Sequence, residues 1–103
     1  MSRYARRVDG NHAAIVAHLR AAGCAVLDLH ALPGGLDLLI GFRGRLWLVE
    51  VKDGAKSASR RALTPAEVAT IESFQRAGCP VLVVLSADEA LTAIGAIDAQ
   101  RPA

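Results

Sequence analysis

The feature that most constrains this fold is a pair of apolar segments that flank Arg43-Gly44. The segments run from Leu36 to Phe42 and from Arg45 to Lys52, and both are rich in Leu, Ile, Val, Phe and Trp. A two-residue turn that contains glycine joins antiparallel strands, because glycine adopts the positive φ angle that such turns require. The sequence therefore predicts a β-hairpin in which Phe42 pairs with Arg45.

The chain before the hairpin predicts a helix and then a strand. Apolar side chains recur at helical spacing between residues 9 and 22, and Gly23 follows where helices commonly end in the left-handed conformation. The apolar segment from Cys24 to His30 predicts a strand, and Pro33-Gly34-Gly35 predicts the turn that ends it.

The chain after the hairpin predicts a loop, a helix, a strand and a last helix. Residues 53–62 are small, polar and basic, and Thr64-Pro65-Ala66-Glu67 has the pattern of a capping box that starts a helix ending at Gly78. The uniformly apolar segment from Pro80 to Leu85 predicts a strand covered on both faces. Ser86 and Glu89 form a second capping box that opens the last helix. The order αβββαβα predicts an α/β fold with a mixed sheet flanked by helices.

Composition and charge narrow the class of protein. The 103 residues are 52% hydrophobic and 21% charged, which predicts a single domain over residues 1–103. The net charge of +2 does not by itself identify a polyanion-binding protein. Cys24 and Cys79 are too few for a disulfide framework and are expected to be buried thiols. No signal peptide or membrane-spanning run is evident, and a cytoplasmic location is expected.

The hairpin register brings three charged side chains together. A two-residue turn at Arg43-Gly44 places Asp37 opposite Glu50, with Cβ atoms about 4.5–5.5 Å apart. Lys52 lies two residues after Glu50 and therefore on the same face of its strand. A turn of odd length would instead send the two carboxylates to opposite faces.

Two acids and a lysine on one face have a chemical use. Adjacent carboxylates repel each other unless one is protonated, or cations or a divalent metal ion neutralise them. Mg²⁺ takes oxygen ligands and keeps several waters, so the two carboxylates and the carbonyl of Val51 form a suitable set. Lys52 is then expected to orient the attacking water or lower its pKa, as in phosphodiester hydrolysis. An ordinary Glu-Lys pair on an exposed hairpin is the competing interpretation.

The segment GGLDLLIGFRGRLWLVEVKDG, followed by LTPAE, resembles the PD-(D/E)XK nuclease superfamily, in particular the small stand-alone VRR-NUC proteins. The resemblance implies a restriction-endonuclease-like αβββαβ core, here with a short C-terminal helix added. It also implies that Asp37, Glu50 and the Val51 carbonyl bind Mg²⁺ or Mn²⁺ and that Lys52 assists. Stand-alone members look like Holliday-junction-resolvase dimers, so a homodimer that cuts branched or structured DNA is expected.

The chain departs from this pattern at several positions. Leu36 replaces the proline that usually precedes the Asp, and Glu67 stands where many relatives have glutamine, which either weakens a phosphate contact or aids metal binding. The first helix of the family often supplies one more acid. Asp9 and Asn11 are the nearby candidates for that extra ligand, with Asn11 slightly preferred, and capping of the first helix is the alternative that is favoured for either.

Basic residues are the expected contacts to the DNA backbone. One basic cluster lies at the N-terminus and another follows Lys52, and the two either bracket a nucleic acid or are simply solvated. The expected contacts to the DNA backbone are Arg6, Arg7, Lys56, Arg60 and Arg61. Glu67 is a weaker candidate. A catalytically inactive nucleic-acid-binding module and a partner-binding domain are the rival functions.

Histidines and the single tryptophan complete the candidates. His12, His18 and His30 lack metal-ligand spacing and are expected to be surface residues. Trp47 falls opposite Ile40 and is expected in the core or at a dimer interface.

Overall fold

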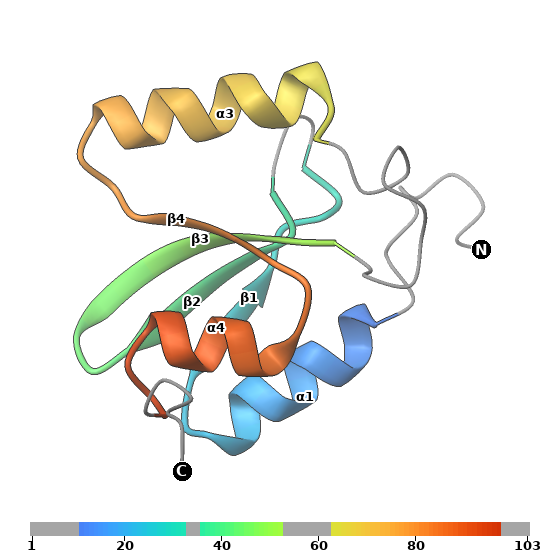
Figure 1. Ribbon diagram of the computed structural model, residues 1–103, viewed down its shortest axis with the longest axis vertical. Helices are drawn as coiled ribbons and strands as arrows, with labels where there is room; N and C mark the ends of the chain where they lie inside the picture. Colours follow the sequence, from blue (N-terminus) through green and yellow to red (C-terminus); the bar gives the residue numbers. More distant parts are fainter. Residues whose placement is uncertain (1–10, 33–35, 53–62, 98–103) are drawn as a thin grey trace, which may run out of the picture.

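The computed structural model describes residues 11–32, 36–52 and 63–97, and its elements follow the expected order αβββαβα (Figure 1). They are α1 (His12–Ala21), β1 (Ala25–Asp28), β2 (Leu38–Phe42), β3 (Arg45–Val51), α3 (Pro65–Arg76), β4 (Val81–Val84) and α4 (Ala87–Ala93). None of the helices in these ranges is long and apolar enough to span a bilayer.

The strands form one four-stranded mixed sheet in the order β1-β2-β3-β4. The first three strands are antiparallel, and β4 lies parallel to β3 at the edge. Phe42 pairs with Arg45 and Leu38 with Val49, so the predicted hairpin register is confirmed. Arg43 and Gly44 both have positive φ angles, 50° and 80°, which is the conformation of a tight type I′ hairpin turn.

The two faces of the sheet are covered unequally. One face carries Ile40, Trp47 and Val49, and it packs against buried side chains of α1 and α4 to form the core. Helix α3 lies across the opposite face of the sheet from α1 and α4 (Figure 1). Only Ile71 of α3 is fully buried, so this second face is incompletely covered.

The helix boundaries follow local signals in the sequence. Thr64 and Glu67 form the predicted capping box, with Pro65 in the first turn of α3. Ser86 accepts a hydrogen bond from the Glu89 backbone, but the Glu89 side chain accepts from the Leu85 N–H, so only half of the second capping box forms.

Three expectations about burial are wrong. β4 is an edge strand on which Val83 remains 47% exposed, because only β3 pairs with it and α3 covers it sparsely. Cys79 is exposed, since it lies after the end of α3, whereas Cys24 is buried as expected. His12 is buried rather than on the surface.

Candidate active site

Asp37 lies just before β2, where hydrogen bonds to the backbone of the two neighbouring segments hold it. Its Oδ2 accepts a hydrogen bond from the Val51 N–H at 2.8 Å, and its carbonyl accepts one from the Leu29 N–H at 2.7 Å. The hairpin register, continued one residue beyond β2, sets Asp37 opposite Glu50. Asp37 is 7% exposed, so the carboxylate sits at the margin of the core.

Glu50 of β3 and Lys52, one residue beyond its end, lie on the sheet face that carries Asp37, as the alternation of side chains along a strand requires. Glu50 is 2% exposed and Lys52 is 9% exposed. The Lys52 Nζ lies 3.1 Å from the Glu50 Oε2. The three residues predicted from the hairpin are therefore brought together, and all are buried.

Glu67 joins this cluster from α3. Its Oε1 lies 3.1 Å from the Lys52 Nζ and also accepts a hydrogen bond from the Thr64 N–H at 2.9 Å. The capping interaction that starts α3 thus also points Glu67 at Lys52. The sequence suggested a DNA contact or an aid to metal binding for Glu67, and its contact with Lys52 could not be read from the sequence.

The surroundings shift the pKa values of Glu50 and Glu67 in opposite directions. Burial, together with the neighbouring Glu67 and Asp37 carboxylates, raises the pKa of Glu50 to about 8. Burial also raises the pKa of Glu67, but hydrogen bonds with Glu50, the Thr64 N–H and Lys52 outweigh it and leave that pKa lowered. Glu50 is thus the member of the pair that holds a proton in the metal-free protein.

Lys52 remains charged in spite of its burial. Desolvation lowers the pKa of an ammonium group, but the contacts with Glu67 and Glu50 more than compensate, so the pKa of Lys52 is raised. A permanent positive charge therefore lies between two carboxyl groups.

The donor atoms at this site fit a hard divalent cation. Glu50 Oε1 is buried and accepts no hydrogen bond from the described residues. The N–H and carbonyl of one strand residue point the same way, so the Val51 carbonyl faces the side on which its N–H meets Asp37. No trio of His, Cys, Asp or Glu side chains within the described ranges forms a ready-made metal site. Two carboxylates, a carbonyl and water are nonetheless a set that suits Mg²⁺.

Asn11 connects the start of α1 to the backbone beside the site. Its Nδ2 donates to the Leu85 carbonyl at 2.9 Å and to the Lys52 carbonyl at 3.3 Å. Within the described residues its side chain makes no capping bond, and its Oδ1 is buried without a partner. Asn11 occupies the N-cap position of α1, but its side-chain nitrogen braces the ends of β3 and β4 instead of capping the helix.

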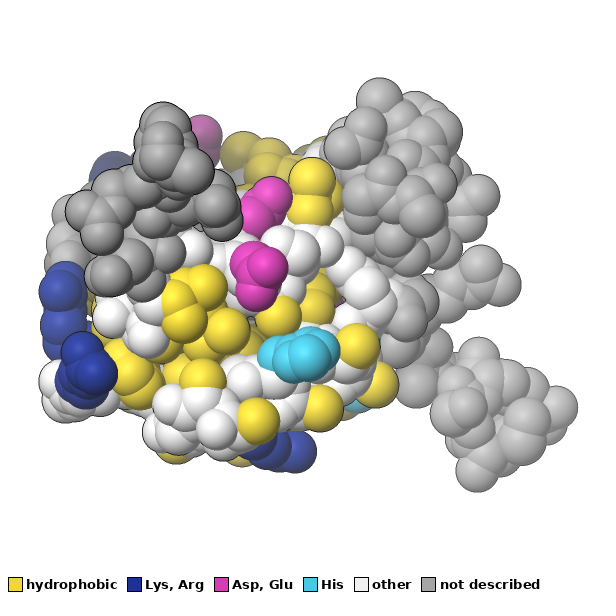
Figure 2. Space-filling model, turned by 60° about the horizontal axis from the view of Figure 1, so that its bottom comes forward, with side chains coloured by type: hydrophobic (Ala, Val, Ile, Leu, Met, Phe, Trp, Pro, Cys, Tyr) yellow, Lys and Arg dark blue, Asp and Glu magenta, His cyan; other side chains and the backbone are white. Residues whose placement is uncertain are grey.

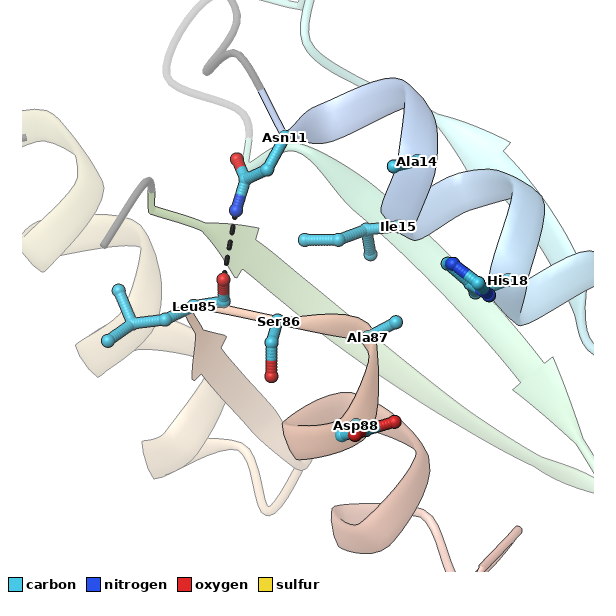
Figure 3. A pocket seen from close by; sticks show the side chains of 8 residues that line it. All are labelled: Asn11, Ala14, Ile15, His18, Leu85, Ser86, Ala87 and Asp88. Atoms are coloured by element: carbon cyan, nitrogen blue, oxygen red, sulfur yellow. Dashed lines mark hydrogen bonds between the residues drawn. The ribbon is translucent and has the colours of Figure 1, made fainter. Parts of the chain in front are cut away.

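Asn11 also borders a groove between α1 and the start of α4 (Figure 3). The groove has a volume of about 400 Å³, and its lining residues include Ile15, His18 and Asp88. None of Asp37, Glu50 and Lys52 lines it, so the groove is separate from the acid-lysine cluster.

A second polar cluster, which was not predicted from the sequence, lies at the same end of the sheet. Asp28 accepts a hydrogen bond from the His30 backbone at 3.0 Å, bonds the His30 ring, and lies 3.3 Å from the His12 Nε2. Partial burial raises the pKa of Asp28, but these bonds leave it lowered. The Asp28-Leu29-His30 spacing signals the tight turn, whereas only the tertiary fold brings His12 to it.

The residues expected to bind the DNA backbone lie mostly outside the described ranges. This applies to Arg6, Arg7, Lys56, Arg60 and Arg61. Asp9, a candidate for the extra metal ligand, also lies outside the described ranges. On the face shown in Figure 2, the described Lys and Arg side chains stand near the margin, while acidic side chains and a histidine lie nearer the middle. The described part of that face therefore offers no broad basic surface.

Comparison with known proteins identifies the fold. A solved structure titled "VRR_NUC domain" is similar to this chain, with a TM-score of 0.60 and 26% sequence identity. The match covers 84% of this chain and 97% of that chain. Searches of family models and of curated proteins gave no match. This likeness, over most of both chains, shows that the protein has a VRR-NUC-like fold of the kind found in PD-(D/E)XK nucleases.

Proposed function

We propose that this protein is a DNA endonuclease that requires Mg²⁺ or Mn²⁺. The observation that carries the proposal is the burial of Asp37 and Glu50 on one sheet face, with Lys52 Nζ 3.1 Å from Glu50. Like charges are costly to bury, and a divalent cation between carboxylates is a common reason for such an arrangement. The nuclease fold adds independent support.

Each residue has a distinct role in this proposal. Asp37, Glu50 and the Val51 carbonyl hold the cation, which activates water and offsets the negative charge of the phosphate when it is bound. The Val51 N–H holds Asp37 in position through its Oδ2. Lys52 orients the attacking water and stabilises negative charge that develops on the phosphate.

Branched or otherwise structured DNA is the proposed substrate, and a homodimer the proposed assembly. A chain this small has little surface for reading bases, which favours recognition of backbone shape. Cutting two strands requires two active sites, which a symmetric dimer provides. The incompletely covered sheet face is an available contact surface for the second copy.

Cleavage of labelled DNA tests this function. We expect cutting of a four-way junction, in preference to a linear duplex, with Mg²⁺ or Mn²⁺ and none with EDTA. Asp37→Asn and Lys52→Ala should each lower the cleavage rate by about 100-fold or more while retaining DNA binding. Asp88→Asn, an exposed change on α4, is the matched control and should cut normally.

Two outcomes would count against the proposal. Undiminished cutting by Asp37→Asn or Lys52→Ala would show that the cleavage comes from elsewhere. DNA binding without cleavage on junctions, flaps, nicks and free ends would favour the inactive binding module. A panel that contains all four substrates therefore distinguishes the alternatives.

A further inference from the structure

One carboxylate oxygen of Glu67 has two partners. Its Oε1 accepts from the Thr64 N–H at 2.9 Å and lies 3.1 Å from the Lys52 Nζ. The first contact fixes the carboxylate to the start of α3, so its position does not depend on Lys52. The second contact draws the ammonium group of Lys52 toward α3.

The ammonium group of Lys52 therefore lies between the carboxyl groups of Glu50 and Glu67 and is largely shielded from solvent. Its Nζ is equally close, at 3.1 Å, to Glu50 Oε2 and Glu67 Oε1. The Lys52 side chain is only 11% exposed, and those of Glu50 and Glu67 are 3% and 12% exposed. Glu67, whose pKa is lowered, is the carboxylate that competes with a phosphate oxygen for this ammonium group.

The charge of the whole cluster adds to this competition. With Glu50 protonated, the carboxylates of Asp37 and Glu67 still outnumber the single ammonium of Lys52. A phosphodiester that enters such a site meets like charge at short range, and like-charge contacts between binding partners are strongly unfavourable. A divalent cation reverses the sign of this interaction.

We infer that Glu67 is a positioning residue for Lys52 that makes entry of DNA into the active site conditional on the divalent cation. The inference rests on the proposed function and specifies the order of binding at the same site. The cation binds first or together with DNA. Without it, Glu67 keeps Lys52 engaged and repels the phosphate.

Glu67→Gln is a well-matched variant for the test. Glutamine preserves the shape of the side chain and can serve as the third residue of a capping box, so α3 keeps its start. It removes the negative charge beside Lys52. Glu67→Asp keeps the charge, and Glu72→Gln removes an exposed charge from the same helix without a contact to Lys52.

The experiment measures the affinity of each full-length variant for a fluorescent four-way junction in EDTA and in Ca²⁺, a cation chosen to permit binding without cleavage. In EDTA we expect Glu67→Gln to bind about tenfold more tightly than wild type, and Glu67→Asp and Glu72→Gln to bind as wild type does. In Ca²⁺ the advantage of Glu67→Gln should shrink to about twofold or less. Thermal melts establish that each variant is folded.

The outcomes separate this inference from the proposed function. Equal affinity of wild type and Glu67→Gln in EDTA overturns the inference, even if Mg²⁺-dependent cleavage is intact. Tight binding by Glu67→Asp in EDTA also overturns it, because the charge would then not be the cause. Failure of wild type to bind DNA with or without Ca²⁺ overturns the proposed function, and the inference falls with it.

Discussion

At the scale of single residues, the most informative side chain is the buried acid Glu50. Burial and two neighbouring carboxylates raise its pKa from 4.5 to about 8. The unfolded chain has no such environment, so it releases this proton near the ordinary value. The folded state therefore binds the proton over a pH range in which the unfolded state does not.

This difference predicts how stability depends on pH in the metal-free protein. Below about pH 4.5 the contribution of Glu50 to the free energy of unfolding is fully present. That contribution is lost progressively as the pH rises from about 4.5 to about 8. Glu50→Gln cannot ionise and should escape the loss. In EDTA near pH 9 we expect its Tm to exceed that of wild type by about 5 °C or more.

Thermal unfolding across this pH range checks the prediction. Glu72→Gln is the matched control, because Glu72 is exposed on α3, and it should follow the wild-type curve. Parallel curves for Glu50→Gln and wild type would show that Glu50 does not carry this linkage.

At the scale of elements, α3 links helix initiation to the active site. Thr64 Oγ1 accepts from the Glu67 N–H, while Glu67 Oε1 serves both the Thr64 N–H and Lys52. Helix α4 begins with a comparable bond, from the Glu89 N–H to Ser86, but within the described residues this cap contacts Leu85 and Ser86 rather than Lys52. Variants at the two caps can therefore distinguish an effect on stability from an effect on the active site.

Removing each cap tests this separation. Thr64→Ala and Ser86→Ala should each lower the free energy of unfolding by about 1 kcal/mol, since each loses one capping bond. Only Thr64→Ala should also lower the cleavage rate, because it loosens Glu67 beside Lys52. Urea denaturation and cleavage assays measure the two effects, and equal loss of cleavage in both variants would contradict the link.

At the scale of the whole molecule, the sheet face that carries the active site also carries unburied apolar surface. Along this face the catalytic candidates lie at one end of the strands, and apolar side chains continue toward the hairpin. Leu46 is 62% exposed there and borders an apolar groove of about 440 Å³ together with Phe74 and Pro80. Apolar surface of this kind is typical of an interface.

The proposed homodimer can be tested at this groove. If the second copy covers it, Leu46→Lys should convert a dimer into a monomer without unfolding it, because Leu46 is already exposed in one chain. Leu32→Lys, an equally drastic change at another exposed leucine, is the control and should leave the dimer intact. Light scattering after gel filtration measures the mass, and an unchanged mass for Leu46→Lys would place the interface elsewhere.

Local patterns in the sequence determined the hairpin, its register and therefore the meeting of Asp37, Glu50 and Lys52. These features depend on neighbours in the chain and on a turn that admits only certain backbone angles. The capping box at Thr64 followed from the same kind of local chemistry, and both expectations are confirmed.

Contacts between distant segments were decided only by the tertiary structure. The packing of α3 placed Glu67 against Lys52, and the packing of α1 buried His12 against Asp28 and set Asn11 across the ends of β3 and β4. The apolar side chains of β4 predict a strand that is covered on both faces, yet its position at the sheet edge leaves Val83 exposed. A sequence records the apolar character of a segment, whereas which surfaces are covered depends on how all the elements pack together.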